Sequence, residues 1–281
     1  MGREQVDLDE TQIPGGVYLC QISDSISCGA CCGLYNVADP SHENLSALLE
    51  NRTDLFDQTP RDFDSLSAFA LTIENQENQE RPYPEFHHCP YLGLVGNNRN
   101  RPGCLLHPLG KNNKNTDHRG LSHWGGFACA SYFCPTCHEL PARYKKILRA
   151  CVDNWYIFGL ALTENRCLGT YFGMIEKLLG HELVFEEVQN NTVFQESVNR
   201  FLNLKTTWPY RKKPFNRMGN YFFKDDLYPR ETIDYEQLGC TIPPCDPILQ
   251  SLGTWCRDMT ELNHAIQNID DMIHDAANTL D

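Results

Sequence analysis

The sequence contains no apolar stretch long enough to span a membrane, which takes roughly 18 consecutive apolar residues. Its first residues, MGREQVDLDETQIPGG, also lack the apolar segment of a secretory signal peptide. No GxGxxG, Walker A, HExxH or GxSxG motif occurs in the chain. We therefore expect a cytoplasmic protein without a membrane partner, and the common nucleotide-binding and hydrolase signatures give no support for those activities.

Positive charge is also scarce. Lys and Arg number 24 against 37 Asp and Glu, so the formal net charge is −13 and the pI is about 5.2. A chain with this charge repels nucleic acid, and we do not expect nucleic acid as a partner. One segment, WPYRKKPFNRMGNYFF at 208–223, interleaves basic and aromatic residues in a way that could stack on bases. We favour the simpler interpretation, a solvated loop whose aromatic rings turn inward.

Cysteine, in contrast, is abundant and unevenly distributed. The chain has 14 cysteines, although 281 residues can bury a sufficient core without cross-links. In a reducing compartment, clustered cysteines are metal ligands or catalytic thiols rather than disulfides. The predicted metal ligands are the nine cysteines of the first half: Cys20, Cys28, Cys31, Cys32, Cys89, Cys104, Cys129, Cys134 and Cys137.

Two pairs among these nine cysteines, at 28–31 and 134–137, have the Cys-x-x-Cys spacing that brings both sulfurs to one metal ion. The neighbours Cys31 and Cys32 do not suit a single tetrahedral ion, because adjacent side chains diverge. Either one of them is not a ligand, or there are two metal centres. We therefore expect a polynuclear site that holds an iron–sulfur cluster or zinc ions.

Some of the same residues also suit other chemistry. The 134–137 pair precedes a predicted helix, as in dithiol redox sites, but no βαβ frame surrounds it. His107 follows Cys104 at a spacing that suits a further ligand. Acid–base catalysis would have only loose candidates, namely His118 and His123 with Asp117.

Two more cysteines, Cys240 and Cys245 in CTIPPC, could form a second site, and their role is left open. Three function classes follow from these residues. The first is a metal-binding protein whose reaction is not identified, the second a structural zinc-binding interaction module, and the third a thiol-redox or metal-dependent enzyme. These residues do not decide whether the chain is an enzyme.

The order of these motifs resembles a known family. CGACC at 28–32, CPYL at 89–92, RPGCLLHP at 101–108 and the last cysteine group together resemble the YkgJ-type cysteine cluster family. That family has a CxxCxxCC-like pattern and is regarded as a zinc- or iron-chelating domain. The resemblance covers residues 20–137 and implies these metal ligands: Cys28, Cys31, Cys32, Cys89, Cys104, Cys129, Cys134 and Cys137. Here seven residues separate Cys20 from Cys28, and the Arg-Pro pair precedes Cys104 instead of following it.

Apolar spacing predicts several helices. They are expected at 41–56, at 61–73, as one long helix at 140–162, at 171–179 with Gly180 as C-cap, and at 192–202 with Thr192 and Gln195 as a capping box. Residues 86–138 show no periodicity, and we expect metal ligation to organise them. A heptad-like seam from Trp255 to Ile273 could support self-association, although we favour packing within the chain.

These elements define the expected fold class. We predict a mainly α protein with irregular, metal-organised loops, in which a cysteine-cluster half stands beside a helical half. The predicted domains are residues 14–140, which bind the metal, and residues 141–281, which form helices packed against them.

Overall fold

The computed structural model describes residues 10–212, 218–219 and 232–280. Its described part is mainly helical, as predicted, with one two-stranded antiparallel sheet. The N-terminal elements are η1 (Glu10–Gln12), η2 (Pro14–Gly16), η3 (Ala30–Cys32), α1 (His42–Gln58), α2 (Phe63–Gln76), β1 (Leu92–Val95), β2 (Arg101–Cys104), η4 (Arg119–Leu121), α3 (Gly125–Ser131) and α4 (Pro135–Glu139). The C-terminal elements are α5 (Ala142–Cys151), α6 (Trp155–Leu162), α7 (Asn165–Leu179), α8 (Phe185–Val188), α9 (Thr192–Leu202), α10 (Leu204–Thr207), α11 (Asp246–Ser251) and α12 (Met259–Ala277). No described helix is long and apolar enough to cross a bilayer.

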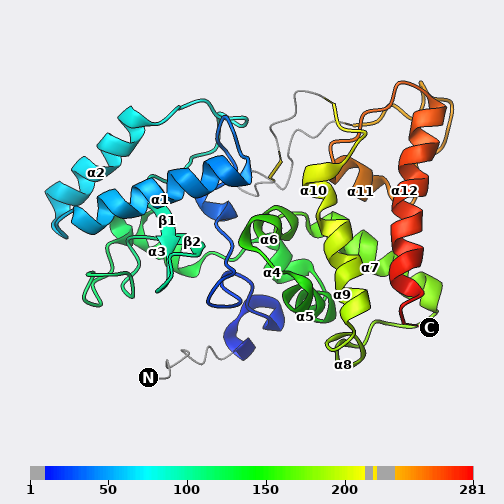
Figure 1. Ribbon diagram of the computed structural model, residues 1–281, viewed down its shortest axis with the longest axis horizontal. Helices are drawn as coiled ribbons and strands as arrows, with labels where there is room; N and C mark the ends of the chain where they lie inside the picture. Colours follow the sequence, from blue (N-terminus) through cyan, green and yellow to red (C-terminus); the bar gives the residue numbers. More distant parts are fainter. Residues whose placement is uncertain (1–9, 213–217, 220–231, 281) are drawn as a thin grey trace.

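Helix α1 lies against the β1–β2 hairpin in the N-terminal half of the molecule (Figure 1). The helix begins where Ser41 accepts a hydrogen bond from the Asn44 backbone, close to the predicted start. Thr53 fixes its position, because its Oγ1 donates to the Leu94 carbonyl and accepts from the Leu94 N–H. A Cβ at Gly93 would lie 2.6 Å from Thr53 Oγ1, so this close approach requires glycine.

Residues 86–138 contain more regular structure than their sequence predicts. They form the β1–β2 hairpin and the short elements η4, α3 and α4. The hairpin also shares a small apolar cluster with α1 and α2, whose members are Phe56, Leu66, Phe69, Ile73, Cys89, Tyr91, Leu105 and Leu106. Each element is too short to give a periodic signal, which explains why the sequence showed none.

The helix predicted at 140–162 is two helices. α5 ends at Cys151 and α6 begins at Trp155, where the Asn154 side chain accepts a hydrogen bond from the Ile157 N–H. Apolar residues continue on both sides of this break, so periodicity alone did not reveal it. α6 is buried along its whole length, which places it at the centre of the helical half.

The sequence predicted the residue that ends α7 correctly and the cap that begins α9 wrongly. Gly180 ends α7 in the left-handed conformation at φ 75°, as predicted, although α7 begins at Asn165 and is longer than expected. For α9, the N-cap is Asn191, whose side chain accepts from the Phe194 N–H. The predicted capping box is therefore wrong, since Gln195 donates to the carbonyls of Val188 and Gln189 instead.

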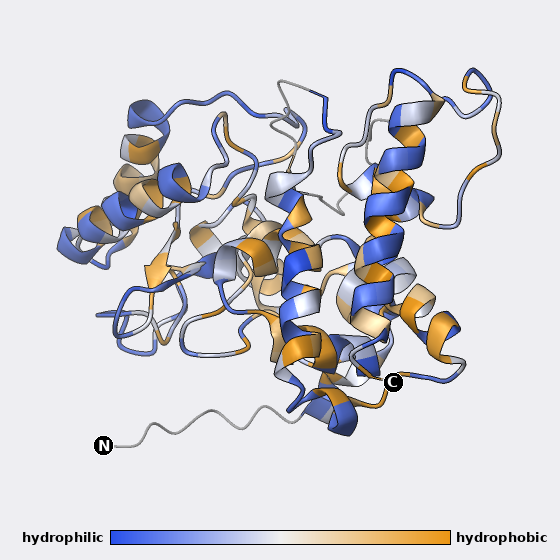
Figure 2. Ribbon diagram, turned by 45° about the vertical axis from the view of Figure 1, so that its right-hand side comes forward, coloured by the Kyte–Doolittle hydropathy of each residue, from blue (hydrophilic) through white to orange (hydrophobic). Residues whose placement is uncertain are grey.

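The C-terminal seam packs within the chain. α12 lies against α7 and α9 and carries hydrophobic and hydrophilic stripes along its length (Figure 2). Its buried residues are Leu262, Ala265, Ile269, Ile273, Ala276 and Ala277. Trp255, the predicted start of the seam, precedes the helix and is 47% exposed. Self-association through this helix stays a prediction.

The main apolar core crosses the predicted boundary at residue 140. N-terminal residues such as Leu19 and Leu34 belong to the same buried cluster as α5, α6 and α7. Tyr35 joins the two sides, because its hydroxyl donates to the Tyr156 carbonyl at 2.9 Å, and Gly159 leaves room for that ring. The division into two domains stays a prediction, and the two halves share apolar burial.

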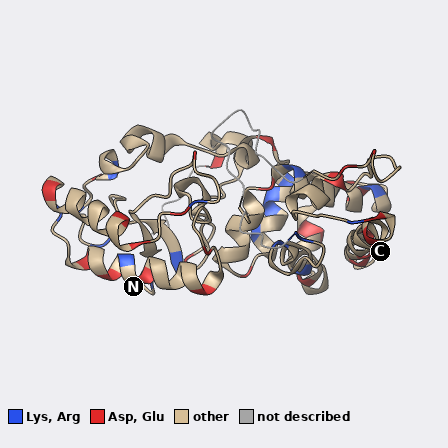
Figure 3. Ribbon diagram, turned by 90° about the horizontal axis from the view of Figure 1, so that it is seen from above, with Lys and Arg blue, Asp and Glu red and all other residues tan. Residues whose placement is uncertain are grey.

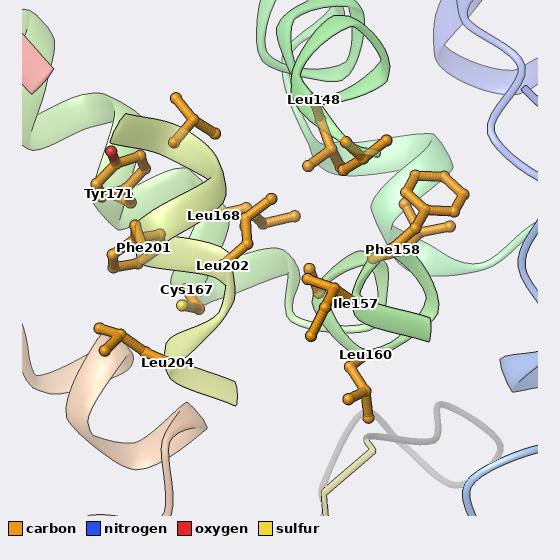
Figure 4. Packing of buried hydrophobic residues seen from close by; sticks show 14 of the residues in the cluster. Leu148, Ile157, Phe158, Leu160, Cys167, Leu168, Tyr171, Phe201, Leu202 and Leu204 are labelled. Atoms are coloured by element: carbon orange, nitrogen blue, oxygen red, sulfur yellow. The ribbon is translucent and has the colours of Figure 1, made fainter. Parts of the chain in front are cut away.

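Replacing Tyr171 with phenylalanine is expected to stabilise the protein. Its ring stacks on Phe201 at 3.7 Å between centroids (Figure 4), while its buried hydroxyl has no hydrogen-bond partner among the described residues. An unsatisfied buried hydroxyl costs about 1–3 kcal/mol, so the free energy of unfolding in urea should rise by about 1 kcal/mol. Tyr35→Phe is the matched control and should lower it, since that hydroxyl is bonded. A loss in both variants would contradict this interpretation.

Candidate metal centre

The nine predicted ligand cysteines come from separate parts of the N-terminal half. Cys20 and Cys28 flank a tight reversal of the chain closed by the Gln21–Ser27 bridge, and Cys31 and Cys32 lie in η3. Cys89 precedes β1, Cys104 ends β2 and Cys129 lies on α3. Cys134 caps α4 and Cys137 lies within it. All fourteen cysteines are described, and all are free thiols.

Four of the nine form a first thiol group, consisting of Cys20, Cys28, Cys134 and Cys137. The Cys28 N–H donates to the Cys20 carbonyl at 2.9 Å, and the thiols of Cys20 and Cys137 are close enough to interact electrostatically. The Cys134 and Cys137 sulfurs lie 3.8 Å apart. Cys28 is close enough to both of these to interact with them electrostatically. Folding thus brings the start of the cysteine-rich region onto its end.

Four others form a second thiol group, consisting of Cys32, Cys89, Cys104 and Cys129. The Cys89 N–H donates to the Cys32 carbonyl at 2.9 Å, and the hairpin register places Cys104 opposite Leu92. Cys32 interacts electrostatically with Cys89 and Cys104, and Cys104 does so with Cys89 and Cys129. The Ser122 hydroxyl lies 3.0 Å from the Cys129 sulfur.

Cys31 stands between the two thiol groups and is exposed to solvent. It interacts with Cys28 and Cys134 of the first group, and with Cys32 and Cys89 of the second. A hydrogen bond between the adjacent thiols lowers the pKa of Cys31 and raises that of Cys32. The adjacent pair therefore sends one side chain to each group, or shares Cys31 between them.

Burial opposes ionisation of Cys28, Cys89 and Cys104. It raises the pKa of Cys89 to about 11 and that of Cys104 to about 12. Burial is also the main reason why the pKa of Cys28 lies well above its ordinary value. A dithiol redox site needs the opposite, a lowered thiol pKa. In the described part of the chain, no three Cys, His, Asp or Glu side chains converge as a ready-made metal site. The thiols are neighbours in two groups whose sulfurs are not yet turned onto a common point.

Arg52 on α1 supports the second thiol group from behind. It is 1% exposed, and its guanidinium donates to the Glu77 carboxylate and to the carbonyls of Cys89 and Leu92. It also donates to His88 Nε2 at 2.7 Å. His88 therefore carries its proton on Nδ1 and donates it to the Gly33 carbonyl at 2.7 Å. This network joins the backbones that follow Cys32 and flank Cys89, and the sequence signalled it only as an arginine within the apolar stripe of a helix.

His88 is expected to make stability pH-dependent. Burial, and then the charge of Arg52, lower the pKa of His88 well below its ordinary value of 6.5. Folding keeps the ring neutral, while the unfolded chain takes up a proton as the pH falls through about 6.5. The free energy of unfolding should then fall by up to about 1.4 kcal/mol per pH unit.

The measurement is urea unfolding of the wild type and His88→Gln at about pH 7.5 and about pH 5.5. Thiol protonation contributes to both proteins and cancels in the comparison. The wild type should lose about 1 kcal/mol more than the variant on acidification. Equal losses would show that His88 is not held neutral by folding.

The histidines that lie near the cysteines in the sequence make contacts of their own. His107 Nδ1 accepts from the Leu109 N–H, and Asp117 is paired with Arg119. The His118 Nε2 atom is buried without a hydrogen-bond partner among the described residues. His123 stacks on His87 at 4.8 Å. The loose acid–base set of the sequence is thus divided among separate contacts.

Cysteines of the second half serve the apolar core. Cys151 and Cys245 are buried in the main cluster, and Cys240 packs against it. Burial raises the pKa of Cys151 and of Cys245 to about 12. A second metal site at Cys240 and Cys245 stays a prediction without a supporting contact.

The basic segment at 208–223 is described only in part, because Lys213, Phe215, Arg217 and Tyr221 lie outside the described residues. Its described start packs inward, since buried Trp208 donates from Nε1 to Thr254 Oγ1 and Arg211 donates to the Leu252 carbonyl. Acidic residues, meanwhile, are spread over helices of both halves (Figure 3). Comparison of the chain with family models, with curated proteins and with solved structures gives no match in any of the three.

Proposed function

We propose that this protein binds metal through its clustered cysteines, in a polynuclear site that holds zinc ions or an iron–sulfur cluster. The first thiol group and the second thiol group each supply four sulfurs, and Cys31 lies between them. Metal binding is the function that these residues support best. Whether the metal is structural or catalytic depends on whether it keeps an open coordination position.

One distance carries the proposal. Four sulfurs at about 2.3 Å from one tetrahedral ion lie about 3.8 Å from one another. The Cys134 and Cys137 sulfurs are 3.8 Å apart, which is the separation of two ligands on one ion.

The donor chemistry fits a metal as well. Thiols with raised pKa values are protonated at neutral pH, and a bound metal ion displaces those protons. A reducing compartment such as the cytoplasm keeps cysteines free for this purpose. The resemblance of residues 20–137 to the YkgJ-type cysteine cluster family supports the same ligands.

The deciding experiment is metal analysis with an absorbance spectrum on anaerobically purified protein. A zinc protein should be colourless and hold about two ions per chain, one for each group of four thiols. An iron–sulfur protein should be brown, with charge-transfer absorbance and acid-labile sulfide. Protein that contains no metal, and takes up none when reduced and given zinc or iron with sulfide, would contradict the proposal.

A further inference from the structure

Lys145 lies on the inner face of α5 and is completely buried. Its ammonium group donates to the Gly15 carbonyl at 2.6 Å and to the Cys137 carbonyl at 2.8 Å. Both acceptors are neutral. Within the described residues, no carboxylate forms an ion pair with Lys145. This lysine is thus a buried charge without a carboxylate counter-ion.

Such a charge needs an anion nearby, because burial of an unpaired ammonium is costly. A second lysine that is well buried among the described residues does have a carboxylate partner, because Lys205 Nζ lies 2.7 Å from Glu164. The groups whose charge would act on Lys145 are the thiols of Cys137 and Cys134, which become anionic when they give up their protons to bind a metal ion. Lys145 therefore faces the part of the first thiol group that has the spacing of metal ligands.

The backbone around Lys145 is fitted closely to its ammonium group. A Cβ at Gly15 would lie 2.2 Å from the Cys137 carbonyl oxygen and 2.3 Å from Lys145 Nζ, and Gly15 has a φ of 69°. The neighbouring Gly16 has the same φ but nothing within 4 Å of such a Cβ. Glycine at position 15 therefore lets the N-terminal segment reach both the lysine and Cys137.

We propose that Lys145 is a positioning residue whose positive charge balances the net negative charge that a metal ion and its thiolate ligands would carry in the first thiol group. This inference rests on the proposed function. A zinc ion with four thiolates carries a net charge of roughly −2, and a buried cation beside it lowers the free energy of the loaded site. The same ammonium group holds the Cys137 backbone, and so fixes the direction of one ligand.

The test uses zinc-loaded full-length protein and the rate at which a chromophoric chelator removes zinc. Lys145→Met removes charge and hydrogen bonds, Lys145→Gln keeps a donor without charge, and Lys145→Arg keeps the charge. We expect the Met and Gln variants to release zinc about ten- to a hundredfold faster, and the Arg variant to stay near the wild type. Gly15→Ala should also accelerate release, whereas Gly16→Ala should not.

The outcomes separate this inference from the proposed function. Wild-type protein that takes up neither zinc nor iron with sulfide would reject both. Stoichiometric zinc with unchanged release from Lys145→Met would reject only the role of Lys145. Wild-type rates in Lys145→Gln would assign the lysine to hydrogen bonding alone and overturn charge balance. If the Met variant does not fold, the Gln and Arg variants still decide the question.

Discussion

Replacing Cys28 with serine should remove the metal of the first thiol group and leave that of the second in place. Cys104→Ser should do the reverse, because these two cysteines belong to different groups. Structural zinc contributes about 10–16 kcal/mol in zinc-finger peptides, so either variant should lose at least several kcal/mol of unfolding free energy. Zinc or iron content and thermal unfolding, measured on the same preparations, check both parts.

Two controls sharpen this experiment. Cys151→Ser should keep full metal content and show only a packing loss, because Cys151 lies in the apolar core. Cys31→Ser should disturb both groups, since Cys31 interacts with each. If Cys28→Ser and Cys104→Ser each remove all the metal, the nine thiols hold one shared cluster. If neither removes any, the ligand assignment is wrong.

Arg52→Met is expected to cost about 3–5 kcal/mol of unfolding free energy, since it breaks a buried ion pair. The change would leave the Glu77 carboxylate, which is 14% exposed, without its cation. It would also strip the carbonyls of Cys89 and Leu92 of a donor. Urea unfolding measures the loss.

Arg257→Met is the matched control. Arg257 pairs with Glu261 through the same groups but is 70% exposed, and exposed pairs contribute about 0–1 kcal/mol. If Arg52→Met and Arg257→Met lower the unfolding free energy by similar amounts, burial does not make the Arg52 network more stabilising than an exposed ion pair. If only Arg52→Met loses much unfolding free energy, and its metal content also falls, then α1 supports the second thiol group.

Local sequence signals predicted the elements that are stabilised by local features. The apolar stripe of α12 and the left-handed Gly180 follow from spacing and from one residue type. The break at Asn154 was missed because its flanks are equally apolar. The candidate ligands were predicted individually, but their division into two groups was not, since it depends on contacts between residues far apart in the chain. Cys20 meets Cys137 only because the tertiary fold brings them together.

That long-range division has a consequence for biosynthesis. Each thiol group begins near residue 20 or 32 and ends at residue 137 or 129, so neither can close on a ribosome-bound chain until more than a hundred residues have emerged. Domains fold as units during synthesis at about 5–20 residues per second. Several seconds therefore pass between the synthesis of residues 28–32 and that of the last cysteines in each group. An ion captured early by this stretch would have too few ligands and would exchange freely. If the two thiol groups hold metal as proposed, stable loading falls late in translation, after the 134–137 pair and the helix behind it have left the exit tunnel.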